Sequence, residues 1–180
     1  TGETREFAMG FELKPEGGFF LSKGGQVHGP RGKLNGTILE VSADGKTMKV
    51  IATGLRQPFL GVDPVSGTLT ASDQQGHWVP STPLHVIKPG SYYGFQPVRL
   101  GPKANEGRTI NEPPLWIPHF VNQSGARQVW LRNARMATLN DSLIHVGYNQ
   151  PALFRIYLDA HGQQGAVAPL LTDFPTGLLS

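Results

Sequence analysis

The chain has 180 residues, of which 23 are Gly, 15 are Pro and none is Cys. The absence of Cys excludes disulfides, thiolate metal sites and covalently attached haem. Charged residues, at 16%, are too sparse for a coiled coil, and aromatic and β-branched residues are too frequent for a disordered chain. The formal net charge is +3, but the 16 Lys and Arg are scattered, which argues against a nucleic-acid partner. No apolar stretch approaches ~20 residues, so no membrane span is expected.

Turn residues divide the chain into short strands. Residues 36–52 form a predicted hairpin whose turn contains Asp44-Gly45, a strong hairpin signal. Residues 59–72 and 152–171 have the same pattern, with turns at 63–67 and 159–162. No window shows the apolar stripe of an amphipathic helix. The sequence therefore predicts an all-β protein.

Internal similarity indicates a repeated unit. The segments that begin at Ile38, Pro83 and Leu153 resemble one another as a strand followed by a turn, and Pro15 and Pro64 occupy equivalent places in a second pattern. A repeat of roughly 40–50 residues with four strands is typical of a β-propeller blade. We expect a partial β-propeller of about three four-stranded antiparallel blades at 7–52, 59–95 and 127–171. We also expect an insertion at 96–126 and the start of a further blade at 177–180.

In an up-and-down blade, successive strand connections lie at opposite ends of the propeller. Tight turns at 14–18, 42–46, 63–67, 88–90 and 159–163 fall at one end, and longer loops fall at the other. Function is expected on the longer loops. Three blades leave open edges, which tend to pair or aggregate. The chain is therefore predicted to be part of a larger, six- or seven-bladed propeller, completed by further sequence or by another chain.

Three motifs resemble those of a known family. They are Gly54-Leu55-Arg56-Gln57-Pro58, then Asp73-Gln74-Gln75-Gly76, then Gly90-Ser91-Tyr92-Tyr93-Gly94. This order resembles the glucose/sorbosone dehydrogenase-like propellers, the soluble pyrroloquinoline quinone dehydrogenase type, and is nearest to bacterial relatives called membrane-bound dehydrogenases. The segment 113–125 also resembles those relatives, and the resemblance spans nearly the whole chain.

The resemblance implies a quinone site. In that family the arginine and asparagine of the first motif hold pyrroloquinoline quinone, so Arg56 and Gln57 are the candidate cofactor-binding residues, with Gln57 in place of the asparagine. Asn122 stands where the family has its catalytic histidine. Calcium held by backbone carbonyls would leave no sequence trace, and no zinc or EF-hand motif is present. The resemblance also implies a periplasmic or extracellular location, although residues 1–10 have no apolar signal core.

The remaining candidates lie on the longer loops. Histidine and tyrosine can act as general bases or proton donors, and amides, carboxylates and aromatic rings suit a carbohydrate or another small polar ligand. The candidate catalytic residues are His119, His28 and Tyr148. The candidate substrate-binding residues are Asp73, Gln74, Gln75, His77, Trp78, Asn122 and Gln150. Each also has a structural interpretation, as a turn cap, a loop hydrogen bond or a wedge between blades.

Three functions are compatible with these residues. The first is a sugar or alcohol dehydrogenase-like propeller that oxidises a carbohydrate hydroxyl with a quinone cofactor and calcium. The second is a lyase or glycosidase acting on acidic polysaccharide without a redox cofactor, in which Arg56 would clamp a carboxylate. The third is a non-catalytic binding or assembly propeller.

Overall fold

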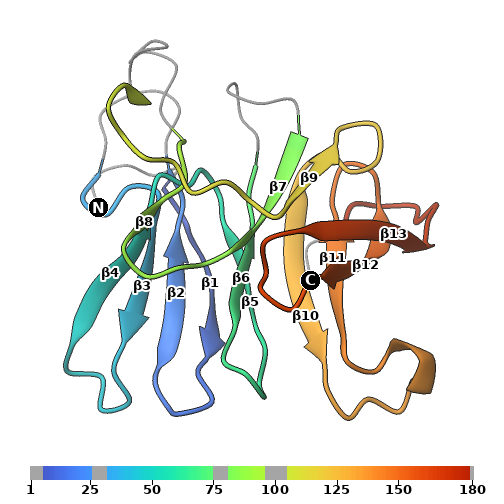
Figure 1. Cartoon of the computed structure of the whole chain (residues 1–180), viewed down its shortest axis with the longest axis horizontal. Coiled ribbons are helices and arrows are strands. Elements are labelled where there is room, and N and C mark those ends of the chain that lie inside the picture. The colour runs from blue at the N-terminus through green and yellow to red at the C-terminus, as the bar shows by residue number, and fades with distance from the viewer. Residues whose placement is uncertain (1–5, 26–31, 75–80, 96–104, 179–180) are drawn as a thin grey trace.

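The structure is a computed structural model that describes residues 6–25, 32–74, 81–95 and 105–178. Three sheets follow one another along the chain (Figure 1), which confirms the prediction of an all-β partial propeller with three four-stranded blades. In the described ranges, no helix has the length and apolar character needed to cross a bilayer.

Each blade is an up-and-down arrangement of antiparallel strands. Blade 1 consists of β1 (Ala8–Leu13), β2 (Phe19–Lys23), β3 (Thr37–Val41) and β4 (Met48–Thr53). Blade 2 consists of β5 (Phe59–Val62), β6 (Leu69–Ser72), β7 (Ser81–Val86) and β9 (Leu115–Pro118). Blade 3 consists of β10 (Gly125–Leu131), β11 (Ser142–Gly147), β12 (Ala152–Leu158) and β13 (Gly165–Leu171), with the 3-10 turn η3 (Ala137–Leu139) between β10 and β11.

The tight turns have the chemistry that the sequence predicts. In the β3–β4 turn, Gly45 has a φ of 69°, and the Asp44 carboxylate accepts hydrogen bonds from Ser42 Oγ and the Lys46 N–H. An Asx-type turn with glycine in the left-handed region reverses the chain within a few residues. The β1–β2, β3–β4 and β5–β6 turns lie together at the lower end of the molecule in Figure 1.

Blade 2 differs from its predicted boundaries. Its fourth strand is β9, which comes from the predicted insertion at 96–126, while the two-residue strand β8 (Ser91–Tyr92) pairs in parallel with β4 of blade 1. Pro113, Pro114 and Pro118 make 113–118 look like a loop. An outer-edge strand tolerates such prolines because one side of it needs no ladder donors. Residues 177 and 178 form no strand, and the rest of the predicted fourth blade lies outside the described residues.

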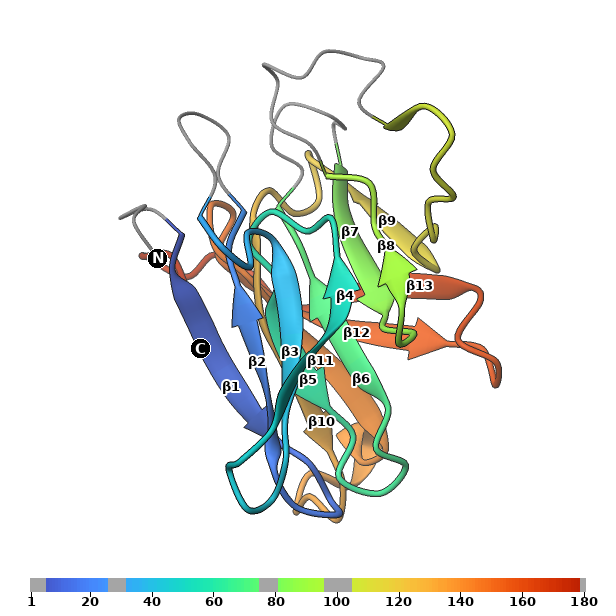
Figure 2. The same cartoon turned by 90° about the vertical axis from the view of Figure 1, so that its left-hand side faces the viewer.

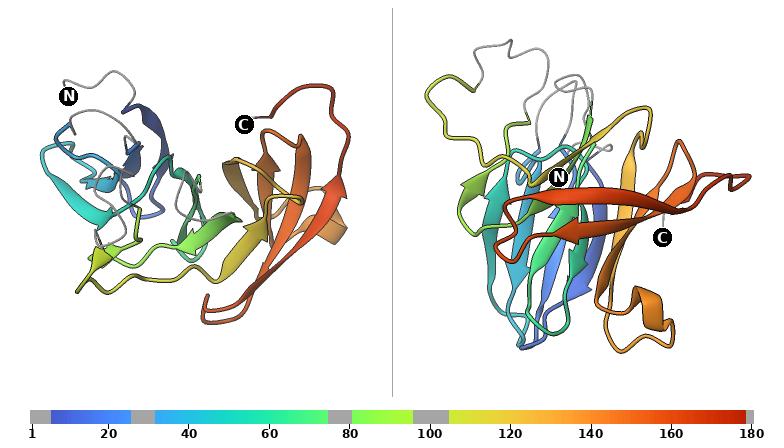
Figure 3. Two further views of the ribbon diagram at one scale, coloured as in Figure 1. Left: turned by 90° about the horizontal axis from the view of Figure 1, so that it is seen from above. Right: turned by 45° about the vertical axis from the view of Figure 1, so that its right-hand side comes forward.

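Two apolar cores hold the blades together. The first joins blades 1 and 2 and includes Ile38, Leu55, Leu60 and Ala71. The second joins blades 2 and 3 and includes Leu84, Ile117, Leu143 and Phe154. The innermost strands β1, β5 and β10 lie next to one another, and the sheets fan around one side of a common axis (Figures 2 and 3).

Two histidines are buried in this framework. His85 packs edge-on against Tyr93 at 4.6 Å between ring centroids, and His145 Nε2 lies 3.0 Å from Asn122 Oδ1. Burial lowers the pKa of His85 to about 3 and that of His145 to about 4, because the charged imidazolium is poorly solvated there. Both rings are therefore neutral in the folded protein near pH 7.

We expect His85 to make the protein less stable in mild acid. Below pH 6.5 the unfolded chain binds a proton that folded His85 does not bind, so the free energy of unfolding falls as the pH drops toward about 3. Between pH 7 and pH 5, wild type should lose about 2 kcal/mol more than the variant His85→Phe. Urea unfolding of both proteins at the two pH values measures this difference. Equal pH dependence in the two proteins would contradict the prediction, and the exposed His161→Gln variant is the control.

Candidate functional site

The Arg56-Gln57 segment is held by a buried carboxylate. Asp73 follows β6, is 3% exposed, and accepts hydrogen bonds from the backbone N–H groups of Arg56 (2.8 Å), Gln57 (2.6 Å) and Gln74 (2.8 Å). Burial raises the pKa of Asp73 to about 6, against the opposing effect of these donors and of the Arg56 charge. Asp73 therefore joins the blade 1–blade 2 loop to the end of β6.

Both the side chain and the backbone of Arg56 bond to neighbouring segments. The Nη1 of Arg56 donates to Gln74 Oε1 at 2.5 Å, and the Arg56 backbone carbonyl accepts from the Gly25 N–H. Partial burial lowers the pKa of Arg56, because the guanidinium has lost part of its hydration. The group remains charged at neutral pH and can bind an anionic ligand.

Ser124 connects these loops to blade 3. Its Oγ accepts from Gln74 Nε2 and from Asn149 Nδ2, each at 3.3 Å, and its carbonyl accepts from the Tyr148 N–H at 3.0 Å. Ser124 has a φ of 66°, so its backbone is in the left-handed region. Loops from blades 2 and 3 are thus held in one polar network next to the segment that follows blade 1.

A cleft of about 430 Å³ opens beside this network. Its polar lining consists of Gln57, Gln74, Ser124 and Tyr148, and its apolar lining includes Phe7 and Phe59. Tyr148 is 41% exposed. A cleft with a few converging polar groups on apolar walls is the usual form of a small-ligand site. We call it the upper cleft.

The structure brings some of the predicted site residues together. Gln57, Gln74 and Tyr148 line the upper cleft, Arg56 bonds to one of them, and Asp73 supports the segment from behind. Ser124 and the two aromatic walls, Phe7 and Phe59, are not among the sequence candidates. Ser124 does belong to a motif that the sequence singles out, whereas isolated Phe residues give no such signal. The predicted residues His28, Gln75, His77 and Trp78 lie outside the described residues.

Other predicted residues lie away from the cleft wall. Asn122 is fully buried, and its Oδ1 contacts His145 while its Nδ2 has no partner in the described part of the chain. His119 directly follows β9, and its buried Nε2 likewise lacks a partner among the described residues. Gln150 is exposed in the turn before β12. None of these three side chains lines the upper cleft.

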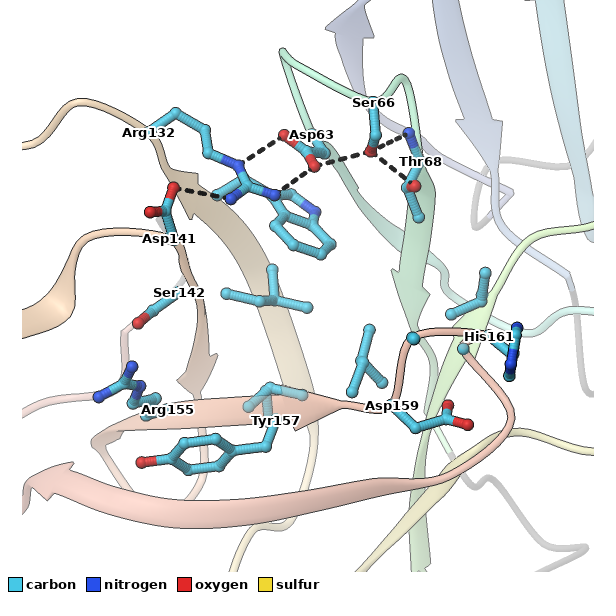
Figure 4. Close-up of a pocket in the computed structure, with 17 residues that line it drawn as sticks. Asp63, Ser66, Thr68, Arg132, Asp141, Ser142, Arg155, Tyr157, Asp159 and His161 are labelled. Atoms are coloured by element: carbon cyan, nitrogen blue, oxygen red, sulfur yellow. Dashed lines mark hydrogen bonds and ion pairs between the residues drawn. The ribbon is translucent and has the colours of Figure 1, made fainter.

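A second cleft, of about 490 Å³, lies between blades 2 and 3 near the β5–β6 turn. Figure 4 shows Arg132 in this cleft, between Asp63 and Asp141. Arg132 donates to Asp63 through Nε (2.9 Å) and Nη2 (2.5 Å), and to Asp141 through Nη1 (2.8 Å). Ser66 Oγ also donates to Asp63. Since Arg132 uses all three guanidinium nitrogens within the protein, we interpret this cluster as a connection between blades.

Solved structures share this fold. A glucose dehydrogenase matches 94% of the chain with a TM-score of 0.72 and 22% identity, and the chain covers 56% of it. The pyrroloquinoline quinone-bound aldose sugar dehydrogenase of Streptomyces coelicolor matches 94% of this chain with a TM-score of 0.68 and 20% identity. The match covers 50% of the dehydrogenase. A putative oxidoreductase (glucose dehydrogenase) from Thermus thermophilus matches 99% of this chain with a TM-score of 0.68 and 18% identity. The match covers 57% of the oxidoreductase.

Neither a protein-family model nor a curated protein matches the chain. The chain spans a little over half the length of the solved structures it resembles. At these identities the likeness establishes the fold alone. The fold is that of the sugar dehydrogenase propellers, as the motifs around Arg56, Asp73 and Gly90 predict.

Proposed function

We propose that this chain forms part of a sugar or alcohol dehydrogenase-like propeller and that its upper cleft holds part of a pyrroloquinoline quinone site. The observation that carries this proposal is Arg56, placed beside the cleft by Asp73 and bonded to Gln74. One structure with this fold contains the same quinone. By the resemblance of the motifs, we further propose a periplasmic or extracellular location.

The donor set of the upper cleft fits such a group. The quinone carries carboxylates, which a guanidinium binds with charge-assisted hydrogen bonds. Arg56, which bonds to Gln74 of the cleft lining, would supply that charge, and Gln57, Gln74 and Tyr148 of the lining would add neutral donors. No group of three or more His, Asp or Glu residues suited to a metal occurs in the described ranges. We propose that any calcium is bound by oxygen ligands near the quinone.

The residues of this chain would then position the cofactor and a sugar hydroxyl. When bound, the quinone supplies the hydride acceptor. Arg56 would hold a carboxylate, and the amides of Gln57 and Gln74 would orient the ligand. For transfer of the hydroxyl proton we propose Tyr148, which lines the cleft, with His119 and His28 as the alternative bases.

Titration with pyrroloquinoline quinone, with and without calcium, tests this proposal. Binding is followed by the absorbance of the quinone, and turnover by reduction of an artificial acceptor with glucose or another aldose. Arg56→Gln should weaken quinone binding by about 10- to 100-fold, because one charge-assisted contact is lost. The loop should remain in place, since Asp73 holds it through backbone N–H groups.

The control for Arg56→Gln is Arg135→Gln, an exposed arginine on the connection between β10 and β11, away from the upper cleft. It should leave quinone affinity unchanged. Equal affinity in wild type and Arg56→Gln would remove Arg56 from the site. Failure of the assembled propeller to bind the quinone would overturn the proposed function. If uronic polysaccharides instead gave a new ultraviolet absorbance, the result would indicate a lyase.

A further inference from the structure

Blade 1 presents an apolar surface on the side away from blade 2. Cross-strand register places Phe11, Leu21, Leu39 and Val50 in one row and Leu13, Phe19, Val41 and Met48 in the next. Phe11 is 61% exposed, Leu13 69%, Met48 56% and Val50 44%. We call these eight residues the blade 1 end face. Leu39 and Val41, at 2% and 9% exposed, form the covered centre of this face, and the four exposed side chains lie around them. Exposed apolar side chains grouped in this way often mark an interface.

Blade 3 presents a matching surface on the side away from blade 2. Val129, Ile144, Arg155 and Ala168 form one row across its four strands, and Val146, Leu153 and Leu171 extend the same side. Val129 is 43% exposed and Leu171 57%, whereas Ile144 (9%) and Val146 (6%) are covered by their neighbours. These seven residues, with Tyr157 (47% exposed), are the blade 3 end face; Arg155 and Tyr157 also border the cleft between blades 2 and 3. Like the blade surfaces that are packed in the two cores, this face consists mainly of apolar side chains.

The three blades form an arc, so the two end faces lie at its two ends (Figure 3). The inner strands β1, β5 and β10 border an open cleft of about 720 Å³ on the concave side. The chain also spans 50–57% of the solved structures with its fold. Two such arcs, related by a twofold rotation about the axis of this cleft, would complete a ring of six blades.

We propose that, in a preparation that holds only this 180-residue chain, a second copy of the chain covers both end faces. The blade 1 end face of each copy packs on the blade 3 end face of the other. A head-to-tail contact of this type forms a closed particle when the rotation that relates one copy to the next leads back to the first copy.

This inference rests on the propeller interpretation in the proposed function, and it names the partner. It also gives the upper cleft a new property. Because residues from all three blades of one copy line the upper cleft, the twofold particle has two equivalent clefts around one axis.

Native mass spectrometry and light scattering of the 180-residue chain test the proposal. We expect a particle with twice the monomer mass of 19.5 kDa. A monomer at every concentration, or a series of larger open assemblies, would overturn it. Quinone binding is measured separately, so a dimer that binds no quinone contradicts only the proposed function. A monomer that binds quinone contradicts only this inference.

Two variants identify the faces. Phe11→Glu places a charge on the blade 1 end face, and Val129→Glu places one on the blade 3 end face. Each alone should raise the dimer dissociation constant by about 100-fold or more, because both junctions of the dimer contain the change. The control Val65→Glu, in the exposed β5–β6 turn, should remain dimeric.

Mixing the two variants gives the decisive result. A mixed dimer contains one junction in which both faces are wild type, so the mixture should form dimers more readily than either variant alone. Rescue of this kind requires folded partners and therefore also excludes misfolding as the cause. If one variant remained fully dimeric, or if mixing restored nothing, head-to-tail closure would be wrong.

Discussion

Replacing Asp73 with alanine should lower the free energy of unfolding by about 3 kcal/mol. The substitution leaves three backbone N–H groups, those of Arg56, Gln57 and Gln74, without the acceptor that now satisfies them. A buried donor without a partner is costly because it has lost its hydrogen bonds to water. The same change should release the segment that carries Arg56, so ligand binding at the upper cleft should weaken as well. Urea unfolding at pH 7 and quinone titration measure the two effects.

The matched control is Asp44→Ala. Asp44 also accepts hydrogen bonds in a turn, from Ser42 Oγ and the Lys46 N–H, but it is exposed, so water can replace the lost acceptor. We expect a loss below about 1 kcal/mol there. If Asp73→Ala were as mild as Asp44→Ala, Asp73 would not be the anchor of this loop. Asp73→Asn, which keeps one acceptor oxygen, should fall between the two.

Replacing Arg132 with methionine should cost about 3 kcal/mol at pH 7. Methionine retains the apolar stem but leaves the Asp63 carboxylate, whose side chain is 2% exposed, without its cation. Arg132 holds the pKa of Asp63 well below its usual value of 3.8. A lowered pKa in the folded state contributes stability above pH 3.8, and this contribution is lost as the pH falls toward the folded-state pKa.

The difference between wild type and Arg132→Met should therefore shrink when unfolding is measured below pH 3.8. The control is Lys46→Met, which removes the exposed pair between Lys46 and Asp44, 3.9 Å apart. Exposed pairs contribute little, so this change should stay within about 0.5 kcal/mol. A difference for Arg132→Met that was independent of pH would show that lost packing, and not charge, explains the destabilisation.

Local turn chemistry made much of the fold predictable. The hairpins at 36–52, 59–72 and 152–171 correspond to β3–β4, β5–β6 and β12–β13, because alternation and turn residues act over a few positions. The fourth strand of blade 2 was not predictable in this way. Its position depends on pairing between β9 and β7, whose sequences are separated by some thirty residues, and its prolines conceal it.

The grouping of three candidate residues could be predicted from the sequence. Arg56, Gln57 and Asp73 lie in motifs that resemble a family, and the structure places them in one network. Asn122 illustrates what the sequence could not provide. Its place in a motif suggests a ligand-facing residue, but whether a loop side chain faces a cleft or the core depends on tertiary packing. Here the buried His145 lies within hydrogen-bonding distance of it.

The parallel pairing of β8 with β4 determines whether blades 1 and 2 can be exchanged separately. Ser91 and Tyr92 follow β7 of blade 2 in the chain, yet they pair with Ala52 and Thr53 at the outer edge of blade 1. Blade 2 therefore supplies its neighbour with an edge strand, in addition to its own four strands. A deletion or exchange of residues 59–95 would expose the β4 ladder groups that β8 now satisfies. Recombination of such chains should succeed when blades 1 and 2 are inherited together, as a pair.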